Sequence, residues 1–318
     1  MQKILIDINH NQLNINNVIQ GIKLYQHDEK TCRIVAVGSK ENMLTIKDLD
    51  GIDTVFTDGI YENPEDLDND EISLTKCFKL LKDKENKFDA FVCSAPLEVI
   101  KAYSEKYLTK ISEFPTFICE YPNAFTGRRT ALLDVGYVIN PTSEELIGMQ
   151  KLGEIYTKKA LYSKNFSFKL LTNVDQTEMN ESTNILADQY FQDIEGYKGF
   201  ISVSDIFSPD CKLVVGDASI ITTMIKSTRA MFDLYENYIN QAVKSDFKTK
   251  MGAKMMNSTF KQINGSLDKK FTSGGTALLG YDANIVVANP TTNSLGFKST
   301  IILAKTLVRC KMLEEIVK

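Results

Sequence analysis

Short apolar runs of strand character alternate with longer runs of helical periodicity along most of the 318 residues. The first helical run, Asn14–Tyr25, has isoleucine or valine at positions 15, 18, 19 and 22, which is the spacing of one helix face. The strand-like runs are Lys3–Ile8, Cys32–Val37, Asp53–Thr57, Ala90–Cys93, Thr116–Glu120, Ala131–Val135, Phe168–Thr172 and Leu213–Gly216. This alternation predicts an α/β fold of three layers, in which a mostly parallel sheet is covered by helices on both faces.

One stretch, from residue 220 to residue 267, departs from the alternation because it is almost continuously helical in pattern. Gly252 and Gly265 are the candidate bends within it. The stretch is too long for one crossover helix, so we expect a projecting helical hairpin. The predicted organisation is an α/β domain made of residues 1–219 and 271–318, with the hairpin at residues 220–270.

The second half of this hairpin combines an apolar stripe with positive charge. The stripe consists of Phe247, Met251, Met255, Met256, Phe260, Ile263 and Leu267, at spacings close to three and four. Lys244–Lys270 contains seven lysines and two acidic residues, a net charge of +5, whereas the whole chain has a net charge of -4. Two interpretations stay open: contact with an anionic membrane or with a partner such as a carrier protein, or packing within the hairpin or across a dimer interface.

The ends of the predicted strands are the first places to look for a site. In sheets of this class, ligands bind beyond the carboxyl ends of the strands. Functional residues are therefore expected in the segments that follow them, which are Asn9–His10, Ser94–Ala95, Asp134–Tyr137, Asn173–Gln176 and Asp217–Ser219.

Several common kinds of site lack their motifs in this chain. It has two histidines and no HExxH, no GxSxG turn and no GxxxxGK[ST] loop. No GxGxxG follows the first strand, where Asp7–Gln12 stands instead. The sequence therefore disfavours a zinc enzyme, a serine hydrolase, a P-loop nucleotidase and a nicotinamide dehydrogenase. The net charge of -4 also argues against nucleic acid as the main partner.

The cysteines and the apolar runs indicate a cytoplasmic setting. The six cysteines are scattered without a CxxC pair, and several lie inside apolar strand-like runs, as Cys93 does. Buried, reduced thiols are the better interpretation. The longest apolar runs, such as Ile301–Ala304, are far shorter than a bilayer span, and the charged start Met1–Ile8 does not read as a signal peptide.

Thr272–Gly280 contains the one conspicuous glycine turn, Gly274–Gly275. Paired glycines allow backbone amides to approach an anion closely, as phosphate-binding loops require. The same pair before an apolar run also occurs as an ordinary turn, so both interpretations stay open.

Five motifs, taken in order, resemble those of the PlsX-type phosphate acyltransferases, a family related in fold to the phosphate acetyl- and butyryltransferases. The best matches are Leu132–Gly136 and Ser273–Gly280. Weaker ones are Lys3–Asp7, Ser204–Ile206 and Val214–Asp217, the last followed by Lys226. The resemblance covers essentially the whole chain, and it implies a three-layer fold like that of isocitrate and isopropylmalate dehydrogenases.

The resemblance implies a cytoplasmic, homodimeric enzyme of bacterial phospholipid synthesis that needs no cofactor. Its partners are acyl-carrier protein and inorganic phosphate, which it converts to acyl phosphate. In the catalytic set, Asp217 would position a donor or a proton, Lys226 (or Arg128 and Arg129) would neutralise phosphate, and His10 would give acid–base help. The residues expected to bind the phosphate or the acyl group are Asp7, Ser94, Asp134, Gly136, Gly274 and Gly275.

Four loops depart from the family pattern. Glycine-containing turns are replaced by Ile8–Asn11, Pro96–Val99 and Ala218–Ile221, and a His-Gly-Ser-Ser pattern by Asn289–Thr292. Branched side chains such as Ile220 obstruct the close backbone approach that glycine permits. The alternative hypothesis is therefore a catalytically degenerate relative that keeps the fold as a binding or scaffolding module.

Overall fold

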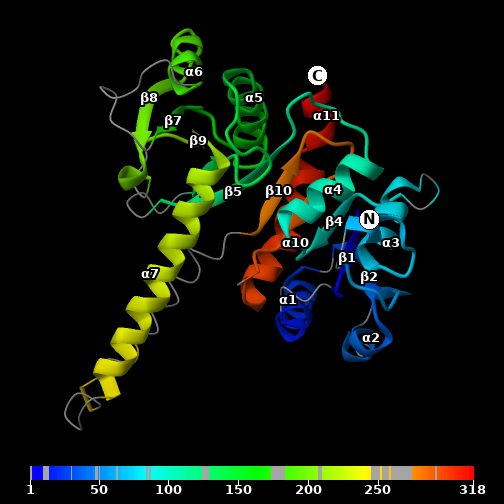
Figure 1. The fold of residues 1–318 in the computed structure, drawn as a ribbon. Helices are drawn as coiled ribbons and strands as arrows, with labels where there is room; N and C mark the ends of the chain where they lie inside the picture. The colour runs from blue at the N-terminus through cyan, green and yellow to red at the C-terminus, as the bar shows by residue number, and fades with distance from the viewer. Residues whose placement is uncertain are drawn as a thin grey trace.

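A computed structural model describes most of the chain. It covers residues 2–9, 14–29, 31–46, 49, 51–61, 64–83, 85, 87–123, 129–172, 183–206, 210–244, 251–252, 258, 274–290 and 292–318. Figure 1 shows one continuous sheet with helices on both sides and one long helix that extends away from the rest.

The described residues form an 11-stranded sheet in the order β3-β2-β1-β4-β11-β10-β5-β6-β9-β7-β8. The strands are β1 (Gln2–Asp7), β2 (Cys32–Gly38), β3 (Ile52–Phe56), β4 (Ala90–Cys93), β5 (Thr116–Pro122), β6 (Arg129–Leu133), β7 (Phe168–Thr172), β8 (Tyr197–Ser202), β9 (Leu213–Val215), β10 (Thr276–Leu279) and β11 (Ile285–Val287). The predicted α/β class is confirmed. The sequence pattern missed β8, β10 and β11, of which β10 and β11 form a short antiparallel pair near the centre of the sheet.

The direction of the strands changes within the sheet. The strands β3, β2, β1, β4 and β11 are all parallel, and β10 is antiparallel to both of its neighbours, β11 and β5. Since β6 is antiparallel to β5, and β9, β7 and β8 are parallel to β6, the second group of strands runs opposite to the first. The carboxyl ends of the two groups therefore do not share one edge.

The helices divide between the two faces of the sheet. They are α1 (Ile15–Asp28), α2 (Lys40–Ile46), α3 (Ser73–Lys82), α4 (Leu97–Tyr107), α5 (Ser143–Lys159), α6 (Thr183–Phe191), α7 (Ala218–Lys244), α10 (Ser294–Arg309) and α11 (Met312–Val317), with 3-10 turns at Pro64–Asp68 and Val203–Asp205. One hydrophobic core lies under α1, α2, α5, α6, α10 and α11, and the other under α3, α4 and α7. All six cysteines are unpaired thiols, and five of them are buried, as predicted.

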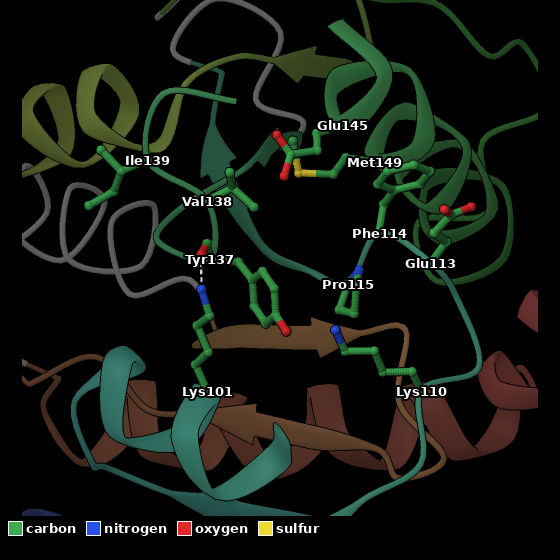
Figure 2. Close-up of a pocket in the computed structure, with 10 residues that line it drawn as sticks. All are labelled: Lys101, Lys110, Glu113, Phe114, Pro115, Tyr137, Val138, Ile139, Glu145 and Met149. Atoms are coloured by element: carbon green, nitrogen blue, oxygen red, sulfur yellow. Dashed lines mark hydrogen bonds between the residues drawn. The ribbon is translucent and has the colours of Figure 1, made fainter. Parts of the chain in front are cut away.

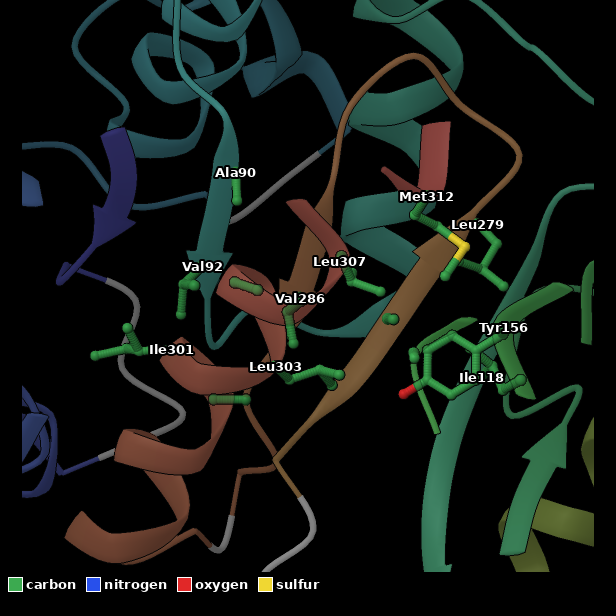
Figure 3. Packing of buried hydrophobic residues seen from close by; sticks show 14 of the residues in the cluster. Ala90, Val92, Ile118, Tyr156, Leu279, Val286, Ile301, Leu303, Leu307 and Met312 are labelled. Atoms are coloured by element: carbon green, nitrogen blue, oxygen red, sulfur yellow. The ribbon is translucent and has the colours of Figure 1, made fainter. Parts of the chain in front are cut away.

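The first core is centred on α10, which the sequence pattern also missed. Its residues Ile301, Leu303 and Leu307 pack against Val92 of β4 and Val286 of β11 (Figure 3). The helix begins where the Asn293 side chain accepts the Gly296 N–H at 3.0 Å, which satisfies one of the free donors of the first turn.

The long arm is α7, which begins at the expected hairpin and runs for 27 residues (yellow in Figure 1). Ile221 and Met224 near its start are buried in the second core, while Met231, Tyr235 and Tyr238 further along are 60% or more exposed. Most of the expected second half of the hairpin lies outside the described residues. No helix in the described part of the chain is long and apolar enough to cross a membrane.

Candidate active site

Two of the predicted site residues, Asp7 and Ser94, follow the carboxyl ends of adjacent parallel strands. The register pairs Ile6 of β1 with Val92 of β4, so Asp7 and Ser94 follow in neighbouring rows. Both side chains are buried, with exposed fractions of 1% and 2%. The carboxyl charge of Asp7 is close enough to contribute to the raised pKa of the Cys93 thiol.

Asp7 is incompletely paired for a buried acid. Its Oδ1 accepts the Asn9 N–H at 3.0 Å, and the Ser73 hydroxyl at the start of α3 lies close enough to lower its pKa. Its Oδ2 has no hydrogen-bond partner among the residues that the structure describes. Burial outweighs the hydrogen bonds and raises the pKa of Asp7 to about 6. The carboxyl can therefore exchange a proton near neutral pH, as a general base or acid must.

Asn9 holds the surrounding loops together, a role that the sequence did not indicate. Its Oδ1 accepts the Ser39 N–H at 2.9 Å and the Asn42 side-chain amide at 3.0 Å, and its own amide donates to the Gly59 carbonyl at 3.2 Å. Ser73 also donates its N–H to the Gly59 carbonyl, at 3.2 Å. The loops after β1, β2 and β3 are thus fixed around Asp7. Only the position of Asn9 after a strand could have indicated it.

Gly274 and Gly275 immediately precede β10 and lie at the same edge of the sheet as Asp7 and Ser94. In the sheet, Thr276 of β10 lies opposite Val287 of β11, which lies opposite Cys93 of β4. Gly275, just before Thr276, is therefore level with Ser94, just after Cys93. A Cβ on Gly275, whose φ is +89°, would meet the Val287 carbonyl oxygen at 2.5 Å, and one on Gly274 would meet a carbonyl oxygen of α10 at 2.5 Å. Close backbone packing therefore requires both glycines in this turn.

Asp134, by contrast, follows β6 in the opposed group of strands and is fully paired. Its Oδ1 accepts the N–H groups of Phe117 (3.0 Å) and Gly136 (3.3 Å), and its Oδ2 those of Tyr137 (2.7 Å) and Val138 (2.6 Å). Burial still raises the pKa of Asp134 to about 6. This carboxylate holds the loop after β6 in place, and Gly136 in that loop packs against Leu97 of α4.

Asp217 and Lys226 lie on α7. The Asp217 carboxylate accepts the Ser219 N–H at 2.6 Å and so caps the first turn of this helix. Lys226 is exposed two turns further on. The Arg129 guanidinium donates to Glu120 at 2.8 Å, whereas His10 and Arg128 lie outside the described residues.

The structure therefore divides the predicted site. Five strand-to-strand steps separate β1 from β6, which at ~4.8 Å per step is about 24 Å across the sheet, and Asp7 and Asp134 also lie at opposite edges of it. Asp7, Ser94, Gly274 and Gly275 share one edge, while Asp134, Gly136 and Asp217 follow strands of the opposed group. The predicted site residues therefore lie at two edges of the sheet, because β6 pairs antiparallel with β5 and reverses the chain direction.

Comparison with known proteins identifies the family. The family model described as "Fatty acid synthesis protein" matches residues 3–315. A phosphate acyltransferase of Sulfurovum sp. (strain NBC37-1) is 25% identical over 315 residues, covering 96% of this chain and 94% of that protein.

Solved structures share the fold at low sequence identity. A branched-chain phosphotransacylase from Enterococcus faecalis V583 superposes with a TM-score of 0.58 and 14% identity, covering 97% of this chain and 99% of that one. A 4-hydroxythreonine-4-phosphate dehydrogenase from Klebsiella pneumoniae gives a TM-score of 0.52 and 8% identity, with 97% and 100% covered. The arrangement of the sheet and the match along nearly the whole sequence lead to one conclusion: the chain belongs to the fatty acid synthesis protein family of PlsX-type phosphate acyltransferases.

Proposed function

We propose that the protein transfers an acyl group from acyl-acyl-carrier-protein to inorganic phosphate, forming acyl phosphate for phospholipid synthesis in the cytoplasm. The observation that carries this proposal is Asp7, a buried acid with one unpaired oxygen at a strand end beside Ser94, in a chain of this family. The test is phosphate-dependent release of carrier thiol from the thioester. No specific contact favours a non-catalytic scaffold over this reaction.

The proposed reaction needs one proton to be moved. A phosphate oxygen attacks the thioester carbonyl carbon, an O–C bond forms, and the C–S bond breaks as the tetrahedral intermediate collapses. Asp7 Oδ2 takes the proton of the attacking phosphate hydroxyl and returns it to the departing thiolate sulfur, so that charge and protons balance. A pKa of about 6 leaves Asp7 largely ionised at neutral pH and still able to carry the proton.

Lys226 is the proposed phosphate cation. Asp7 lies against Ser73 of α3, and α7 packs on the same face of the sheet as α3, since Leu74 and Ile221 belong to one core. Lys226 is exposed on that helix, which packs against β6, five strands away from β1, so its contact with phosphate is proposed separately from the chemistry at Asp7.

Replacing Lys226 by alanine is expected to raise the phosphate KM about 10-fold with a smaller change in kcat, because a charge-assisted contact to an anion is worth about 1.5–3 kcal/mol. Steady-state assays with varied phosphate measure this. Lys23→Ala, an exposed lysine of α1 on the other face, is the matched control. An unchanged phosphate KM in Lys226→Ala would remove the lysine from the site.

The basic segment Lys244–Lys270 is proposed as a peripheral membrane contact and the chain as a homodimer. The charge and apolar stripe of this segment, together with the exposed apolar residues of α7, support these proposals. Flotation with anionic phosphatidylglycerol vesicles is expected to carry the protein upward, and polar replacements of Met255 and Phe260 to abolish this. If the wild-type protein does not bind the vesicles, the segment serves packing alone. Sedimentation equilibrium measures the proposed homodimer separately.

A further inference from the structure

A pocket lies away from Asp7, at the other edge of the sheet. Its volume is about 300 Å³, and it lies between α4, residues 110–115 before β5, the loop after β6 and the start of α5 (Figure 2). Asp7 and Ser94 follow the carboxyl ends of β1 and β4, whereas this pocket lies at the amino end of β5. Because β5 runs parallel to those strands, the two places are at opposite edges.

The walls of this pocket are fixed without any ligand. The buried carboxylate of Asp134 holds the loop that carries Tyr137 and Val138 through their backbone N–H groups. The Tyr137 hydroxyl is 2.7 Å from the Tyr281 hydroxyl, and the Lys101 amino group donates to the Tyr137 carbonyl at 2.8 Å. A preformed cavity needs little reorganisation on binding, which favours affinity.

One side of the pocket carries positive charge. Figure 2 shows the amino groups of Lys101 and Lys110 on the same side as the Tyr137 ring. The amino group of Lys101 also lies 4.5 Å from the centre of that ring. The Lys110 amino group has no hydrogen bond or ion pair to any residue in the described part of the chain, so it is available to an anion.

The rest of the pocket is lined by both apolar and acidic side chains. Phe114, Pro115, Val138 and Met149 line it, and Phe114 is set against Gly148, where a Cβ would overlap its ring. The lining also contains two acids. Glu113 is turned away from the amino groups in Figure 2, and Glu145 accepts from the N–H and the hydroxyl of Thr142 in the capping box of α5.

We propose that this pocket binds a small anion with a short apolar body, a medium-chain carboxylate or an alkyl phosphate, with the anionic head at Lys110. A volume of about 300 Å³ holds about ten non-hydrogen atoms at ~30 Å³ each, which matches octanoate or hexyl phosphate. The two probes separate a carboxylate head from a phosphate head. The site is independent of the proposed acyl transfer, so Asp7→Asn is expected to bind these probes as the wild type does.

Methyl NMR of the methionines tests the proposal, with the Met149 signal assigned through Met149→Leu. Octanoate or hexyl phosphate is expected to shift Met149 but not Met224 on α7, and octanol, which lacks the charge, to bind more weakly. Lys110→Gln is expected to raise the Kd at least about 10-fold, whereas Lys151→Gln, an exposed lysine of α5, leaves it unchanged. No Met149 shift at about 10 mM probe, equal binding of octanol, or an unchanged Kd in Lys110→Gln would overturn it.

Discussion

Replacement of Asp7 by asparagine is expected to lower the phosphate-dependent release of thiol by about 100-fold or more while the protein stays folded, because an amide cannot take the proton of the attacking phosphate. Asparagine keeps the shape of the side chain and an oxygen for the Asn9 N–H. The loss is expected in kcat. Wild-type kcat is expected to fall about tenfold per pH unit below about pH 6, where Asp7 is protonated.

The same replacement is expected to stabilise the protein above pH 6. The pKa of Asp7 is raised from 3.8 to about 6, so the folded state holds the proton more tightly than the unfolded state does. The contribution of Asp7 to the free energy of unfolding therefore falls as the pH rises from about 4 to about 6, by about 3 kcal/mol. Asp7→Asn removes this loss of stability, because the asparagine side chain does not ionise. Urea unfolding at pH 8 and pH 4 measures it: equal stability of the two proteins at pH 8 would contradict the assignment.

Asp134→Ala is expected to have the opposite effect and to lower the free energy of unfolding by about 4 kcal/mol. The alanine leaves four backbone donors, those of Phe117, Gly136, Tyr137 and Val138, without their carboxylate. Each unpaired buried N–H costs about 1–3 kcal/mol, and the loss of a buried charge offsets only part of this. With a total stability of about 5–15 kcal/mol, the variant is close to unfolding.

Asp134→Asn is the matched control, because its one amide oxygen still serves two of the four donors. Its stability is expected to lie between those of the wild type and Asp134→Ala in urea unfolding. If Asp134→Ala is as stable as the wild type, the loop after β6 does not depend on this carboxylate. Asp7 and Asp134 are thus two buried acids with similarly raised pKa values that differ in their hydrogen bonds: Asp7 keeps one oxygen without a partner among the described residues, and Asp134 holds a loop.

The alternation of strands and helices was sufficient to predict the α/β class, because the apolar residues of each element repeat with the period of the face that the element buries. It did not reveal β10, β11 and α10, since the two strands have four and three residues and pair only with distant segments. The antiparallel pairing of β5 with β6 sets the direction of the second group of strands. The direction of a strand depends on which neighbours it finds, and local pattern does not contain that information.

The candidate site was predicted in part for the same reason. Position after a strand singled out Asp7 and Ser94, which follow adjacent strands, and the paired glycines singled out the turn 274–275, which shares their edge. It could not separate Asp7 from Asp134, because the two differ in the backbone donors around them rather than in sequence context. The role of Asn9 depends on Ser39, Asn42 and Gly59, which only the folded chain brings near it.

The most direct test is to incubate the protein with long-chain acyl-acyl-carrier-protein and to follow free thiol with and without inorganic phosphate, for the wild type and for Asp7→Asn. Thiol release that requires phosphate in the wild type and is lost in a folded Asp7→Asn variant is the expected result. Thiol release that Asp7→Asn retains would move the chemistry away from Asp7. No phosphate-dependent release from folded wild-type protein would contradict the proposed acyl transfer itself.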